Sequence, residues 1–233
     1  NPSTNLKNYY LITLNSLFRN QYRDDGVPVD QLISGFVKYV FPKEHAELYF
    51  EYGWNDGSSN LRDLTLELSH SAASIFGIRK LQYLNKNNFL SIEVEATKMA
   101  QSPGYLLRNA GNWYEHSYLK EGYTNENQIM GAGSGFGNNL QTIAISLNKG
   151  WSKYGIKFQH IAQNPRRMVS VWQDTYLGKV DWHDYSYGII LKQKHQNILF
   201  NLNIDWVYSK NYLWQDNLKA NNLFIFFNTI YLW

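Results

Sequence analysis

The chain contains no cysteine and only five prolines among its 233 residues. Without thiols it forms no disulfide, which suits a protein that crosses an oxidising compartment, where stray thiols would pair. It also has no run of roughly 18 consecutive apolar residues, and this excludes a membrane-spanning helix. The mean hydropathy of -0.46 does not exclude a membrane, because strands that alternate apolar and polar residues average to such values.

A strong charge of either sign is missing too. The net charge is +3 and the pI is about 8.8, and no basic run is interleaved with aromatic residues, so we expect no nucleic-acid partner. The six histidines are scattered without the spacing of metal ligands, so we expect no metal and no cofactor. The first residue is Asn1 rather than Met, and we take the chain as a mature or truncated product.

Aromatic residues, by contrast, are abundant: 18 Tyr, 12 Phe and 8 Trp make up 16% of the chain. Many of them fall into segments with a period of two. In residues 198–209 the even positions form an apolar face, made of Ile198, Phe200, Leu202, Ile204, Trp206 and Tyr208. The odd positions are mostly polar, and this alternation is typical of a strand with one apolar face.

Ten such strands are predicted along the chain. Five keep the alternation well, at residues 47–54, 89–97, 154–161, 185–194 and 198–209. Five are less regular, at residues 9–18, 31–41, 73–84, 140–147 and 223–233. A length of about 9–12 residues suits a tilted strand that crosses a bilayer.

The connections between these strands alternate in length. Short connections fall near residues 42–44, 85–87, 148–152 and 195–197, and long ones at residues 55–71, 100–138, 162–183 and 210–222. Short periplasmic turns and long extracellular loops are the plan of bacterial outer-membrane barrels. The pattern therefore predicts an all-β, transmembrane antiparallel barrel in the outer membrane, with both chain ends periplasmic. The alternative is a soluble β-sandwich or lipocalin-like barrel, whose apolar faces would point inward.

Three stretches resemble the Wzi-like capsule-assembly proteins of the outer membrane, particularly those of Bacteroidetes. They are HAELYFEYGWNDGSSNLRDLTLELSHSAASIFGIRK at residues 45–80, NQIMGAGSGFGNNLQTIAISL at 127–147 and NSLFRNQYRDD at 15–25. The resemblance implies a barrel of about eighteen strands with a helical plug near its N-terminus, and a role in attaching capsular polysaccharide or exopolysaccharide to the cell surface.

This chain has about half those strands and no candidate plug. We therefore expect residues 1–233 to form one barrel domain, the C-terminal portion of a longer barrel. Ten strands could also close alone, because the count is even.

Charged residues near the second strand are the first candidate site. Glu51 would face the barrel lumen, while Arg62, Asp63 and His70 would sit at its loop end. Such charges could bind a polar ligand such as a sugar, or they could form an internal ion-pair network with Glu47 that holds the loop.

The glycine-rich segment GAGSGFGNN at residues 131–139 is the second candidate. A phosphate cradle would need a strand before it and a helix after it, whereas here a strand follows, so a tight loop is the better interpretation. Asn138, Asn139 and Gln141 could still bind sugar hydroxyls.

Four tryptophans lie in the long connections: Trp113, Trp172, Trp182 and Trp214. Their rings could stack on sugar rings, or they could belong to the aromatic belt at the membrane interface.

Catalysis has little support. His183 lies beside Asp184, with Ser186 close by, but adjacent strand residues point to opposite faces and do not make a triad. Glu93 and Glu95 share a face as a glycosidase pair would, yet no cleft is indicated. We expect a protein that is not an enzyme and that attaches surface polysaccharide. The alternatives are a porin-like channel and a barrel subunit that contacts other outer-membrane proteins.

Overall fold

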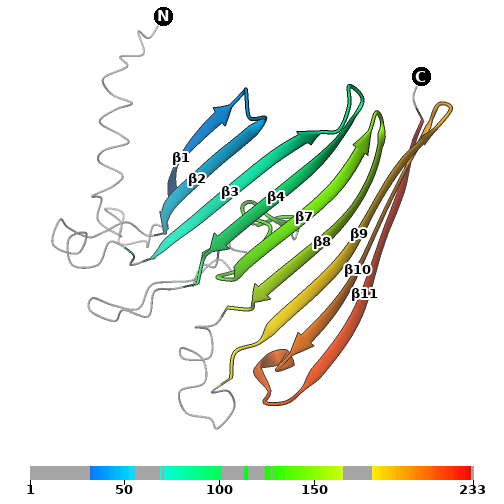
Figure 1. The fold of residues 1–233 in the computed structure, drawn as a ribbon. Coiled ribbons are helices and arrows are strands. Elements are labelled where there is room, and N and C mark those ends of the chain that lie inside the picture. The colour runs from blue at the N-terminus through cyan, green and yellow to red at the C-terminus, as the bar shows by residue number, and fades with distance from the viewer. Residues whose placement is uncertain are drawn as a thin grey trace, which may run out of the picture. The chain divides into compact units, whose positions relative to one another are not determined.

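The computed structural model describes residues 32–55, 69, 71–100, 113–114, 124–126, 128–164 and 180–231. These residues form an all-β fold, as the alternation predicts. Nine strands make one sheet in the order β1-β2-β3-β4-β7-β8-β9-β10-β11, and neighbours in the chain are neighbours in the sheet (Figure 1). The strands are β1 (Leu32–Phe41), β2 (Ala46–Asn55), β3 (Ala72–Tyr83), β4 (Asn88–Lys98), β7 (Asn139–Lys149), β8 (Ser152–Ala162), β9 (His183–His195), β10 (Ile198–Lys210) and β11 (Lys219–Tyr231).

Each of these nine strands coincides with a predicted one to within a few residues. The tenth prediction, at residues 9–18, lies outside the described residues. Within the described part of the chain the strand order is linear, with β1 at one end and β11 at the other. No helix of that part is long and apolar enough to cross a membrane.

The chain divides into two compact units. The first unit contains residues 1–35, 51–74 and 99–137, and the second contains residues 36–50, 75–98 and 138–233. The second unit holds the whole of β4 and of β7 to β11. The first holds the loop-side ends of β1 to β3 and the long connection from β4 to β7.

In the second unit, one face of the sheet is apolar across six strands, and we call it the apolar face. Directly opposed residues form rows that run from β4 to β11. The central row consists of isoleucine alone: Ile92, Ile145, Ile156, Ile189, Ile204 and Ile225. Ile156 is 64% exposed and Ile225 is 62% exposed, so no described residue covers the apolar face here.

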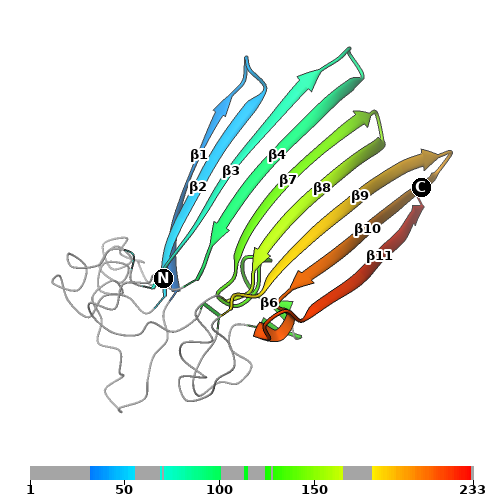
Figure 2. The same ribbon diagram turned by 60° about the horizontal axis from the view of Figure 1, so that its bottom comes forward.

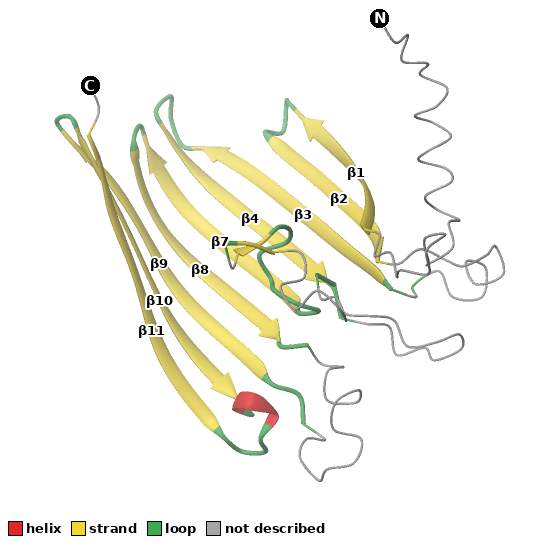
Figure 3. Ribbon diagram, turned by 180° about the vertical axis from the view of Figure 1, so that it is seen from behind, coloured by secondary structure: helices red, strands yellow, loops and turns green. Residues whose placement is uncertain are grey.

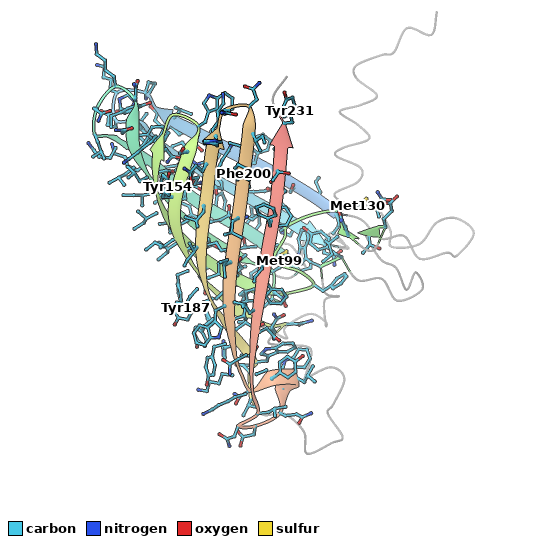
Figure 4. The ribbon with its side chains drawn as sticks, turned by 90° about the vertical axis from the view of Figure 1, so that its right-hand side faces the viewer. Met99, Met130, Tyr154, Tyr187, Phe200 and Tyr231 are labelled. Atoms are coloured by element: carbon cyan, nitrogen blue, oxygen red, sulfur yellow. The ribbon has the colours of Figure 1, made fainter. Side chains whose placement is uncertain are left out.

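A row of apolar and aromatic residues lies on either side of the isoleucines. Toward the long connections it contains Val94, Ile143, Phe158, Tyr187, Trp206 and Leu223. Toward the short turns it contains Leu90, Leu147, Tyr154, Leu191, Leu202 and Phe227. Figure 4 shows Tyr154 and Tyr187 projecting from the same side of the sheet. Stacked rings join Tyr187 to Trp206, with centroids 5.6 Å apart.

The opposite side, which we call the polar face, carries small, amide and charged side chains. Lys157 on β8 reaches across β9 to Asp205 on β10, with Nζ 2.9 Å from Oδ1 and 3.2 Å from Oδ2. Gly188 on β9 makes this crossing possible, because a Cβ there would lie 2.3 Å from Asp205 Oδ1. On the edge strand β11 the polar face ends in two phenylalanines, Phe224 and Phe226.

Short turns and long connections alternate as predicted. Turns at residues 42–45, 84–87, 150–151 and 196–197 join β1 to β2, β3 to β4, β7 to β8 and β9 to β10. The connection from β10 to β11 lies at the other end of the strands and contains the 3-10 turn η1 (Tyr212–Trp214), which the alternation does not predict (Figures 2 and 3).

The first unit has a small core of its own. Met99, Trp113 and Tyr114 are buried in it, and partly buried Ala132 and Phe136 from the glycine-rich segment pack against them. The Trp113 indole lies over Gly53 and donates from Nε1 to the Ser71 carbonyl at 3.0 Å. This unit also contains a small hairpin of two strands with two residues each, β5 (Thr124–Asn125) and β6 (Gln128–Ile129).

Candidate functional site

Three aromatic side chains gather in the second unit at the long-connection end of β9 and β10, and we call them the indole cluster. Trp182 immediately precedes β9, while Tyr212 and Trp214 belong to η1. The Trp182 ring meets both others edge to face, with centroids 5.0 Å from Tyr212 and 5.0 Å from Trp214. Segments separated by some thirty residues therefore meet because β9 and β10 form a hairpin.

A buried carboxylate fixes this cluster. Asp184 on β9 is 8% exposed, and its Oδ1 accepts a hydrogen bond from Trp182 Nε1 at 2.7 Å. Its Oδ2 accepts from Gln163 Nε2, also at 2.7 Å. The Gln163 carbonyl in turn accepts from Trp214 Nε1 at 3.2 Å. Both indole N–H groups are thus used inside the cluster, and the ring orientations are held by charge-assisted and neutral bonds together.

Asn211 ties the η1 turn to the start of β9. Its backbone is left-handed, with φ 55°, a conformation that asparagine tolerates better than most residues. Its Nδ2 donates to the Asp181 carbonyl at 3.0 Å, and its Oδ1 accepts from the Asn217 amide at 3.2 Å. The turn is therefore held at both ends by one side chain.

The arrangement suits carbohydrate recognition. Rings that are fixed before binding offer apolar area at little entropic cost. Exposed polar side chains around the rings can form hydrogen bonds with sugar hydroxyls, and they belong to Asp181, Gln215, Asp216 and Asn217. Leu213, which is 49% exposed, adds apolar surface on the same turn.

A second group lies on the apolar face next to the indole cluster. Gln141, a predicted site residue, contacts His160 with 2.6 Å between Oε1 and Nδ1. His160 Nε2 lies 3.0 Å from His183 Nδ1. Tyr185 stacks on His160 at 4.9 Å and on Tyr208 at 6.4 Å. His183 and the neighbouring Asp184 thus have different partners on opposite faces of β9.

The remaining predicted residues are dispersed. Glu51 accepts a hydrogen bond from Ser34 Oγ at 2.6 Å, within the first unit. Trp113 is 6% exposed, so we assign it to the core of that unit rather than to a ligand surface. Asn138 is 8% exposed, and its Oδ1 accepts from the Asn164 amide at 2.8 Å. Asn139 begins β7, opposite Lys98.

Four predicted residues, Arg62, Asp63, His70 and Trp172, lie outside the described part of the chain. Glu47 does form ion pairs, but with strand residues that the sequence analysis does not name as its partners. Its carboxylate contacts Lys38 at 2.6 Å and Arg79 at 3.1 Å, and Arg79 also lies 3.7 Å from Glu93.

The sequence identifies Trp182 and Trp214 as candidates but misses three of their partners. Gln163, Asp184 and Tyr212 join the cluster only through the pairing of β8 with β9 and β9 with β10. The one signal for Asp184 was its place beside Trp182 and His183. Among the described residues, no group of three His, Asp or Glu side chains is close enough to hold a metal ion.

No protein-family model, curated protein or solved structure matches the chain.

Proposed function

We propose that this chain is a membrane-spanning part of an outer-membrane β-barrel and that its long-loop end attaches capsular polysaccharide or exopolysaccharide to the cell surface. The observation that carries the membrane placement is the uncovered apolar face. In a soluble sandwich or lipocalin-like barrel the apolar face would be buried against other chain. Here six directly opposed isoleucines, flanked by two further apolar rows, lie on one face of the sheet, and the other face is polar, as suits a lumen.

The dimensions of β10 agree with this placement. Ile204 is the middle residue of Ile198–Lys210, six residues from either end. Six residues extend about 20 Å, and a tilt of roughly 40° reduces this to about 15 Å along the membrane normal. That is half the thickness of a typical hydrocarbon core, about 30 Å. The isoleucine row would then lie at the bilayer midplane.

The polysaccharide role rests on the indole cluster and on the resemblance of residues 45–80 and 127–147 to Wzi-like capsule-assembly proteins. A repeating polymer needs only weak contacts at each site, because many copies on one cell surface add avidity. Preformed aromatic rings beside exposed carboxylates and amides supply such contacts.

The test is the binding of fluorescently labelled capsular polysaccharide to cells that carry the protein. Trp182→Ala should lower binding several-fold, since it removes the ring that contacts both Tyr212 and Trp214. Trp151→Ala is the matched control, because Trp151 is a 58% exposed indole at the short-turn end. Equal binding by the two variants and the parent, at equal surface amounts, would refute the polysaccharide role.

A porin-like channel is the second candidate, favoured by the ion pairs on the polar face. The pair Lys157–Asp205 and the group Lys38–Glu47–Arg79 would line a water-filled lumen. Single-channel recordings in planar bilayers decide between the candidates. A steady conductance that changes its ion selectivity in Asp205→Asn would favour the channel, whereas a silent bilayer would favour the attachment role.

A further inference from the structure

We propose that the long-loop end of the apolar face binds the phosphate groups of a phosphorylated glycolipid in the outer leaflet of the membrane. The proposal rests on the membrane placement argued above. It concerns a surface of the second unit that is separate from the indole cluster and carries no part of the polysaccharide role.

The first observation is a graded series of rows on the apolar face. Beyond the row of Trp206 comes a row of amide, imidazole and phenol groups: Ala96, Gln141, His160, Tyr185, Tyr208 and Asn221. The next row is cationic, and we call it the cation row: Lys98, Asn139, Ala162, His183, Lys210 and Lys219. The rows thus change from apolar to aromatic to cationic. Side chains of membrane proteins follow the same order from the bilayer midplane to the headgroups.

The second observation is the close approach of like charges. Lys210 on β10 and Lys219 on β11 are directly opposed in an antiparallel pair, so their Cβ atoms lie about 5 Å apart. Lys210 is also directly opposite His183 on β9. Like charges in this position destabilise a sheet. An anion that bridges them would remove that cost.

The third observation is that the described residues supply no such anion on this face. Neither the cation row nor the row beneath it contains an Asp or Glu. Within the described residues, none of the ion pairs involves Lys98, Lys210 or Lys219. The opposed lysines are both exposed, so a ligand can reach them from the lipid side.

The level of the row identifies the ligand. Lys210 lies six residues from Ile204, about 15 Å from the midplane after correction for tilt, which is the boundary between hydrocarbon and headgroups. At that depth the anions are lipid phosphates. A phosphate monoester carries up to two charges and three acceptor oxygens, so one group can accept from two ammonium groups at once. The row of His160, Tyr185 and Tyr208 beneath would pack against the glycolipid sugars and upper acyl chains.

The opposite end of the same face differs. On β9, β10 and β11 the corresponding positions, six residues from the isoleucine row toward the short turns, are His195, Ile198 and Tyr231, with no lysine. The asymmetry places the phosphate-binding end on the side of the long loops, which is the outer leaflet in the proposed topology.

The experiment reconstitutes the protein in phosphatidylcholine nanodiscs that contain a trace of lipid A, either bisphosphorylated or dephosphorylated, and counts retained lipid A by native mass spectrometry. The test variant is Lys210→Gln/Lys219→Gln. The matched control is Lys153→Gln/Lys192→Gln, which removes another directly opposed lysine pair, but from the polar face near the short turns. A further arm adds inorganic phosphate to distinguish a free-anion site from a lipid site.

We expect the parent and the control to retain bisphosphorylated lipid A several-fold more than the dephosphorylated form. The test variant should lose that preference, and millimolar inorganic phosphate should not displace the lipid. Equal retention of both lipids, or an unchanged preference in the test variant, would overturn the proposal. Displacement by inorganic phosphate would overturn it as a lipid site. If the protein does not enter nanodiscs at all, the membrane placement itself fails, so the two failures are distinguishable.

Discussion

At the residue scale, several glycines act by leaving room for a neighbour's side chain to cross the strand. The Tyr49 side chain on β2 passes over Gly77 on β3, and its hydroxyl group donates a hydrogen bond to Glu95 Oε2 on β4, with 2.5 Å between the two oxygens. A Cβ on Gly77 would lie 1.9 Å from Tyr49 Cζ, which no small adjustment relieves. The Tyr49–Glu95 hydrogen bond therefore depends on Gly77, because any larger residue at this position would occupy the space of the Tyr49 ring.

We expect Gly77→Ala to destabilise the protein by about 1–3 kcal/mol, the usual cost of overpacking. The measurement is the urea midpoint of the protein refolded in lipid vesicles. Gly35→Ala is the control: it is also a strand glycine, but nothing lies within 4 Å of its added Cβ. It should be neutral or slightly stabilising, because alanine loses less backbone freedom on folding. In a Tyr49→Ala background the cost of Gly77→Ala should largely vanish, and a cost that persists would contradict the crossing argument.

Residue-level detail of this kind is also what the sequence predicts least. Nothing in the sequence shows which side chain crosses which glycine, because that depends on the register between strands. The indole cluster illustrates the same limit. Trp182 and Trp214 stand out by type and position, but Asp184 becomes their anchor only through strand pairing that brings Gln163 to its other oxygen.

At the scale of elements, the sequence predicts far more. The sequence locates all nine strands of the sheet, five by alternation over eight to twelve residues and four by a less regular pattern. The elements it misses are the short ones. β5 and β6 have two residues each and η1 has three, too few to show a period. Even β11, apolar on both faces from Leu223 to Phe227, is found by its length and composition.

The apolar face should tolerate a charged residue in a soluble fold but not in a bilayer. In the chain alone Ile156 is 64% exposed, so a soluble fold would accept Ile156→Lys within roughly 0.5 kcal/mol. If the isoleucine row lies at the bilayer midplane, the same substitution should cost about 2–4 kcal/mol. Urea unfolding in lipid vesicles measures the difference. Gln159→Lys on the polar face of the same strand is the control and should cost little. Equal, small effects at both positions would argue against a lipid-facing row.

At the scale of the whole molecule, the number of strands limits how the sheet can close. The nine antiparallel strands of the described residues leave β1 and β11 running in the same direction, so a direct pair between them would be parallel. Closure with antiparallel pairs alone requires an odd number of further strands. One more, such as the strand predicted at residues 9–18, gives ten, and nine more give the eighteen that the Wzi-like resemblance implies. Both totals satisfy the even count of bacterial barrels.

The two edge strands of the sheet, β1 and β11, carry large exposed apolar side chains. Phe36 on β1 is 80% exposed, and on β11 Phe224 and Phe227, which lie on opposite faces, are each 60% exposed. An uncovered edge strand with large apolar side chains is a template for aggregation. These strands are therefore expected to pair with further strands when the protein is in the membrane.

The proposed topology can be tested by cysteine labelling, because the chain contains no cysteine of its own that would react. Asp216 lies in the exposed turn between β10 and β11, and Lys86 lies in the short turn between β3 and β4. In the proposed orientation Asp216→Cys faces the medium and Lys86→Cys faces the periplasm. A bulky maleimide that does not cross the outer membrane should label Asp216→Cys on intact cells, and Lys86→Cys only after the membrane is permeabilised. Labelling of both on intact cells would refute membrane crossing by these strands. The reverse pattern would keep the membrane but invert the barrel, and the cation row would then meet the periplasmic leaflet rather than the outer one.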